Sequence, residues 1–130
     1  MARVIICDDD QAVADELAAA LRALNHDATT SIHTMDVLRD AADGCFDLVA
    51  FGLDRAGFSS EHAIDAMREL APHVSVIGFH QRPAEFLRVA ANSRLSAVLP
   101  RPVPVTVFLY AVARALAEQP LNNSLAAPGV

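Results

Sequence analysis

Short hydrophobic runs alternate with longer segments of helical spacing along most of the chain. Residues 3–7 read Arg-Val-Ile-Ile-Cys, a continuous run rich in β-branched residues, which is typical of a strand covered on both faces. Residues 11–25 repeat hydrophobic side chains every three or four positions, which predicts an amphipathic helix. The same reasoning predicts strands over residues 3–7, 28–32, 47–53, 74–79 and 97–99.

Helices are predicted between these strands, and residues that favour helix ends lie at several of their boundaries. They are expected over 11–25, from 34 to about 44, from 59 or 60 to 70, from 83 onward, and over 105–118. Asp10 and Thr34 are candidate N-caps. Alternating strands and helices with short connections predict an α/β fold, a doubly wound parallel sheet. We expect one domain over residues 1–118 and a flexible C-terminal tail or linker over 119–130.

Composition narrows the classes of function. The net charge is −6 over 130 residues, which argues against non-specific binding to nucleic acid or an anionic membrane. No hydrophobic run approaches the ~20 residues of a membrane span, no signal peptide is evident, and two cysteines make no disulfide framework. A cytoplasmic protein is therefore expected. All ten basic residues are arginine, so no lysine is available for chemistry.

The residues that follow the strands are the candidates for function, because ligands bind at the carboxyl ends of strands in such sheets. Asp8, Asp9 and Asp10 follow the first run. Adjacent carboxylates repel one another, and a hard cation such as Mg²⁺ would relieve that repulsion. The alternative is that Asp10 caps a helix and the other two are solvated.

Four stretches together resemble a known family. Residues 4–10, 46–53, 76–81 and 97–103 are similar to the first, third, fourth and fifth strands of response-regulator receiver domains, in the right order and spacing. The resemblance covers residues 3 to about 118. It implies a flavodoxin-like receiver fold with strand order 2-1-3-4-5 and a role in signal transduction through a two-component phosphorelay.

The chemistry that the resemblance implies is largely missing from this chain. The family phosphorylates an aspartate where this sequence has Gly52, and its switch Ser or Thr is His80 here. Its lysine is Arg101, its switch aromatic is Val98, and only its acidic pair is kept. The chain therefore resembles atypical pseudo-receivers with no catalytic residue. The expected degenerate phosphorylation site consists of Asp8, Asp9, Gly52, His80 and Arg101.

Asp54 and Asp9 are the alternative phosphoryl acceptors. Asp54 lies two residues beyond Gly52, and that shift keeps the strand face but moves ~6–7 Å along the chain. We therefore interpret Asp54 as an ordinary loop residue outside the acidic cluster. The alternative function is a phospho-accepting regulator that uses Asp54 or Asp9.

Arg101 is expected to pair with Asp8 or Asp9, because a guanidinium can bind a carboxylate bidentately. The resemblance implies a cis bond between Arg101 and Pro102. Neither a metal nor another cofactor is expected. His80 is interpreted as filling space, with metal binding or titration near neutral pH as alternatives.

The resulting hypothesis is a non-enzymatic signalling module that binds protein partners, or a second copy of itself, independently of phosphorylation. In receivers the face of the fourth helix, fifth strand and fifth helix commonly carries such contacts. Here it would include Phe86, Arg88, Arg94, Phe108 and Tyr110, although Phe86 and Phe108 also suit core packing. Binding of an anionic nucleotide by arginine ranks last, since no Gly-rich phosphate loop follows any strand.

Overall fold

The computed structural model describes residues 1–54, 60–84 and 95–119, and nine helices and strands lie within these ranges. The strands are β1 (Arg3–Cys7), β2 (Asp27–Ser31), β3 (Leu48–Gly52), β4 (Ser75–His80) and β5 (Leu95–Pro100). The helices are α1 (Gln11–Ala23), α2 (Thr34–Ala42), α3 (Ser60–Leu70) and α5 (Val105–Ala117). Most of the helix predicted from residue 83 onward and most of the predicted tail lie outside the described residues.

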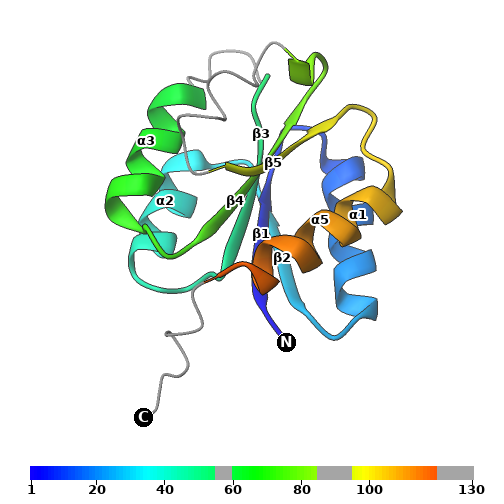
Figure 1. Cartoon of the computed structure of the whole chain (residues 1–130), viewed down its shortest axis with the longest axis horizontal. Coiled ribbons are helices and arrows are strands. Elements are labelled where there is room, and N and C mark those ends of the chain that lie inside the picture. Colours follow the sequence, from blue (N-terminus) through cyan, green and yellow to red (C-terminus); the bar gives the residue numbers. More distant parts are fainter. Residues whose placement is uncertain (55–59, 85–94, 120–130) are drawn as a thin grey trace.

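The strands form one parallel sheet in the order β2-β1-β3-β4-β5, which confirms the predicted doubly wound fold. Helices α1 and α5 cover one face of the sheet, and α2 and α3 cover the other (Figure 1). Because all strands run the same way, their carboxyl ends lie at one edge, at the top in Figure 1. None of the described helices combines the length and hydrophobicity that crossing a membrane requires.

Strand β1 is hydrophobic from Val4 to Cys7 because both faces of the sheet are buried there. In β1, Val4 and Ile6 pack on the α1 and α5 side, while Ile5 and Cys7 pack on the α2 and α3 side. Alternate residues of one strand therefore enter two separate cores. This arrangement accounts for the unbroken hydrophobic run at residues 3–7.

The structure shows the positions of two residues of the predicted partner surface. Phe108 was included in it, and that assignment is wrong, because its ring is fully buried and meets the Phe79 ring edge-on with centroids 5.8 Å apart. Tyr110 lies on the same helix and is 64% exposed. The remaining three residues of the prediction, Phe86, Arg88 and Arg94, lie outside the described residues.

Several predicted helix ends differ from the structure by one or two residues. Asp10 caps α1 as predicted, because its Oδ1 accepts a hydrogen bond from the backbone N–H of Val13 (3.2 Å). However, α1 ends at Ala23 instead of residue 25, and Asn25 has a left-handed φ of 69°. Thr34 does not cap α2 but is its first residue, and its Oγ1 lies 3.9 Å from Cys7 Sγ.

Candidate functional site

Arg101 brings its guanidinium to the carboxyl edge of the sheet from the turn after β5. Its Nη1 and Nη2 donate to Oδ2 and Oδ1 of Asp8, each at 2.9 Å, in the bidentate geometry expected of a guanidinium and a carboxylate. The predicted pairing with the acidic pair is therefore confirmed, and Asp8 is the partner. The predicted cis bond between Arg101 and Pro102 is also present.

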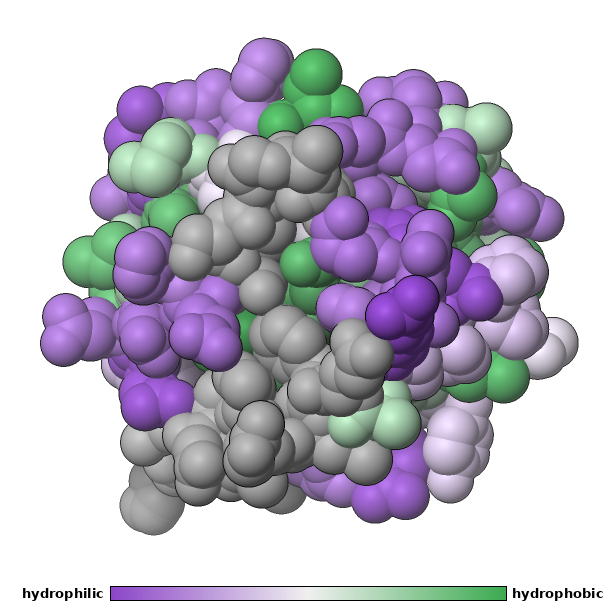
Figure 2. Space-filling model, turned by 90° about the horizontal axis from the view of Figure 1, so that it is seen from above, coloured by the Kyte–Doolittle hydropathy of each residue, from purple (hydrophilic) through white to green (hydrophobic). Residues whose placement is uncertain are grey.

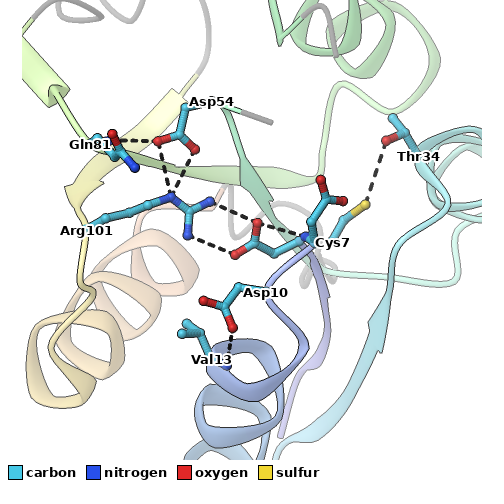
Figure 3. Close-up of polar contacts among 9 residues, drawn as sticks. Cys7, Asp10, Val13, Thr34, Asp54, Gln81 and Arg101 are labelled. Carbon is cyan, nitrogen blue, oxygen red and sulfur yellow. Dashed lines mark hydrogen bonds and ion pairs between the residues drawn. The ribbon is translucent and has the colours of Figure 1, made fainter. Parts of the chain in front are cut away.

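Asp54 joins this cluster, contrary to the prediction that it would lie outside. Arg101 Nε donates to Asp54 Oδ1 at 2.9 Å, and Asp54 Oδ2 accepts from the backbone N–H of Gln81, also at 2.9 Å (Figure 3). The prediction failed because it neglected the length of the arginine side chain, which reaches both Asp8, after β1, and Asp54, after β3. In addition, Leu53 N donates to Phe79 O (2.8 Å), so the chain stays beside β4 beyond Gly52.

The three charged groups are largely removed from water. The side chains of Asp8, Arg101 and Asp54 are 2%, 17% and 18% exposed. Burial by itself would raise the pKa of the Asp54 carboxyl, but the Gln81 N–H and the Arg101 guanidinium outweigh it and hold this pKa below its usual value. Burial likewise opposes the charge of Arg101, and its bonds to Asp8 and Asp54 overcome that and raise its pKa. Asp54 and Arg101 are therefore both charged near neutral pH.

Gly52 is a steric requirement of this cluster. A Cβ atom built at position 52 would overlap Asp8 Oδ1 and come within 2.5 Å of Arg101 Nη2. No larger side chain fits there while the ion pair keeps its geometry. An acceptor carboxylate at position 52 would therefore require the ends of the Asp8 and Arg101 side chains to move out of their present geometry.

The residues present do not fit the hard divalent cation that adjacent carboxylates could bind. Both Asp8 oxygens accept from Arg101, and Oδ1 also accepts from the Asp9 N–H (3.0 Å). Position 52 offers no side-chain oxygen, and the guanidinium charge repels a cation. Across the described ranges, no group of three or more His, Cys, Asp or Glu side chains is arranged to hold a metal.

The other predicted site residues lie near the cluster with different surroundings. His80 ends β4, and its Nδ1 accepts from the backbone N–H of Arg82 (2.8 Å), so this nitrogen takes part in the loop after the strand. Asp9 is exposed. Val98 packs against the core on the α2 and α3 side. The described surface at this end of the molecule is mostly hydrophilic (Figure 2).

Sequence reasoning missed Asp54, the Gln81 amide and Phe79 as members of the site. The Arg101 guanidinium carbon lies 5.9 Å from the centroid of the Phe79 ring, within reach of a cation–π interaction. The signal for Asp54 was its place on the same strand face as Gly52. No sequence pattern marks the backbone N–H of Gln81, because every residue except proline carries one.

Comparison with known proteins identifies the fold. Neither a family model nor a curated protein sequence matches the chain. Among solved structures, the chain is similar to a CheY-like response regulator receiver domain from Methanospirillum hungatei JF-1, with 20% identity and a TM-score of 0.81 over 90% of this chain and 94% of that one.

Two further structures agree. A response regulator receiver domain from Clostridium thermocellum has 16% identity and a TM-score of 0.79, covering 90% of this chain and 95% of that chain. A Francisella response regulator receiver domain has 14% identity and a TM-score of 0.79, covering 90% and 98%. At these identities the likeness concerns the backbone, and the chain has the fold of a response-regulator receiver domain.

Proposed function

We propose that this domain is a pseudo-receiver, a non-catalytic cytoplasmic signalling module that binds a protein partner, or a second copy of itself, independently of phosphorylation. The receiver fold supports a role in signalling, since its solved examples are response regulators. The state of the module would be set by its own side chains.

The observation that carries the proposal is the arrangement around Gly52. The acceptor position has no side chain, and the Arg101–Asp8 pair fills the space into which one would project. A phosphoryl group attached there would need both a new carboxylate and a displacement of the Arg101 and Asp8 side chains. Two features therefore oppose phosphorylation at position 52: glycine offers no acceptor group, and the Asp8 and Arg101 side chains occupy the space beside it.

The partner surface is proposed on α5 and the neighbouring edge strand β5. A shallow groove between them is lined by Leu99, Val107 and Tyr110, and Val107 and Tyr110 are both exposed. Large aromatic side chains are common at protein interfaces because they bury much area at small entropic cost. We expect Tyr110→Ala to weaken partner binding or self-association without affecting the ion-pair cluster at the carboxyl edge of the sheet.

Treatment with acetyl phosphate and Mg²⁺, followed by intact mass spectrometry, tests the absence of phosphorylation. The mass is expected to stay unchanged in the wild type and in Gly52→Asp, because the new side chain collides with Asp8 and Arg101. A gain of one phosphoryl group that disappears in Asp54→Ala or Asp9→Ala would establish the alternative, a phospho-accepting regulator. In the structure both Asp54 oxygens already accept hydrogen bonds, which does not favour that alternative.

Magnesium titration provides a second test. Both Asp8 oxygens are used by Arg101, and Mg²⁺ requires near-octahedral oxygen ligation, so we expect no saturable binding below about 1 mM. The amide NMR shifts of Asp8, Asp9 and Asp10 would report such binding. Saturation at lower concentration would contradict the proposed closure of the site.

A further inference from the structure

We propose that the Asp54 carboxylate permanently fastens the segment after β4 to the turn after β5, so that these two segments keep one arrangement without any phosphoryl group. The fastening consists of the hydrogen bonds that Asp54 accepts from Gln81 N and Arg101 Nε, and we call it the Asp54 bridge. This inference rests on the proposed function, because it explains how a receiver fold holds a state that phosphorylation does not set.

The bridge connects elements that are far apart in sequence. Asp54 follows β3, Gln81 follows β4 and Arg101 follows β5, and Asp54 lies 27 residues from Gln81 and 47 from Arg101. Through the other end of its guanidinium, Arg101 also binds Asp8 at the end of β1. Four of the five strand ends are thus joined through two carboxylates, one guanidinium and one backbone amide (Figure 3).

The two segments also touch without Asp54, but less strongly. Arg101 N donates to His80 O at 3.2 Å, which continues the ladder between β4 and β5 by one residue. Arg82 N donates to His80 Nδ1, and this bond shapes the loop from within. In neither of these two hydrogen bonds are the donor and the acceptor both charged groups. The Asp54 bridge is a charge-assisted connection between the two segments, and such hydrogen bonds are roughly twice as strong as neutral ones.

The bridge is permanent because all of its parts are carried by the chain. Asp54 is 18% exposed, so water competes poorly for its oxygens. Its carboxyl keeps a pKa below the usual value, so it remains an anion throughout the neutral range. A regulatory phosphoryl group comes and goes, whereas a carboxylate on the main chain does not.

The shape of one surface hollow depends on the bridge. This hollow lies between the start of α1 and the turn after β5, and it is lined by Asp10, Val13, Gln81, Arg101, Pro102 and Val103. Two of these residues, Gln81 and Arg101, are the ones that Asp54 joins. Loss of the carboxylate would remove one contact from each of these two walls, so we expect Asp54 to contribute to the shape of the hollow.

Amide hydrogen exchange measured by NMR in the full chain tests the bridge. In Asp54→Ala the Gln81 amide loses its acceptor, so its exchange should accelerate about tenfold or more relative to core amides such as Ile6 and Ala50. Asp54→Asn keeps an oxygen for Gln81 but loses the charge, and we expect a smaller acceleration. This variant also serves if Asp54→Ala folds poorly.

Asp47→Ala is the matched control. The Asp47 carboxylate also accepts from a backbone N–H and from an arginine side chain, but both belong to Arg3 at the opposite edge of the sheet. Its removal should leave Gln81 exchange unchanged relative to the core. Equal Gln81 exchange in Asp54→Ala and Asp47→Ala would overturn the bridge. A phosphoryl group found by mass spectrometry would instead refute the proposed function and leave the exchange result standing.

Discussion

Each end of the sheet carries an arginine–aspartate pair, and the two pairs differ mainly in their contact with water. At the amino edge, Arg3 Nη2 lies 3.1 Å from Asp47 Oδ1, with side chains 49% and 34% exposed. At the carboxyl edge, Arg101 Nη2 lies 2.9 Å from Asp8 Oδ1, with side chains 17% and 2% exposed. The distances are nearly alike, so distance alone does not separate the two edges.

The comparison shows that the burial of an ion pair decides how much unfolding free energy is lost when one partner is removed. At the amino edge, water can solvate either partner once the other is gone, and salt screens the attraction. At the carboxyl edge, removal of Arg101 would leave the buried Asp8 carboxylate without its neutralising partner, which is far less favourable. The same two residue types therefore act as a surface contact at one edge and as a structural centre at the other.

The largest effect is expected from Arg101→Met. The variant should lose about 3 kcal/mol of unfolding free energy, near the lower end for a broken buried pair because the Arg101 side chain is 17% exposed. Urea denaturation at pH 7 with EDTA present measures this, since EDTA prevents a divalent ion from replacing the guanidinium. A loss no larger than that of Arg3→Met would erase the proposed difference between the edges.

Gly52→Ala is expected to have the next largest effect, about 1–3 kcal/mol of destabilisation, because the added methyl overlaps Asp8 and Arg101. The double variant Gly52→Ala with Arg101→Met should be less destabilised than the sum of the two, because both substitutions disturb the same cluster. Denaturation of all four proteins of this cycle supplies the coupling energy. Additive losses would mean that Gly52 is not required by the ion pair.

The acid dependence of stability should distinguish the carboxylates. The pKa of Asp54 is lower in the folded protein, so its contribution is complete above the usual aspartate pKa of about 3.9 and is lost as the pH falls through the lower folded value. The stability gap between wild type and Asp54→Asn should therefore narrow below about pH 4. A gap of the same size at pH 7 and near pH 2.5 would show that the charge of Asp54 is unimportant.

The smallest effect is expected from Arg3→Met at the exposed edge. Burial opposes the Asp47 charge and Arg3 outweighs it, so the pKa of Asp47 is also lowered, but both side chains remain accessible to water. We expect a small loss of stability that becomes smaller still in 1 M salt, where the Debye length is about 3 Å. A large loss that is insensitive to salt would place this pair in the same class as Arg101–Asp8.

Much of the fold follows from local pattern, whereas the error at the candidate site occurs where a side chain reaches across the fold. The run at residues 3–7 predicted β1 with its bounds unchanged, because a strand covered on both faces needs hydrophobic residues at every position. The strand predicted at 97–99 is Leu95–Pro100, since β5 is an edge strand and its partly exposed positions carry less hydrophobic signal. Phe108 was misplaced because an aromatic residue suits a core and an interface equally well.

The candidate site likewise combines features that the sequence predicted with features that only the tertiary structure showed. The sequence by itself determined that Asp8, Gly52, His80 and Arg101 follow strands of a parallel sheet, so their convergence at one edge was predictable from topology. Only the tertiary structure decided that Arg101 lies between Asp8 and Asp54, and that the Gln81 amide completes the arrangement. The physical reason is that strand order places residues to within one side-chain length, while hydrogen bonds depend on differences of a few tenths of an ångström.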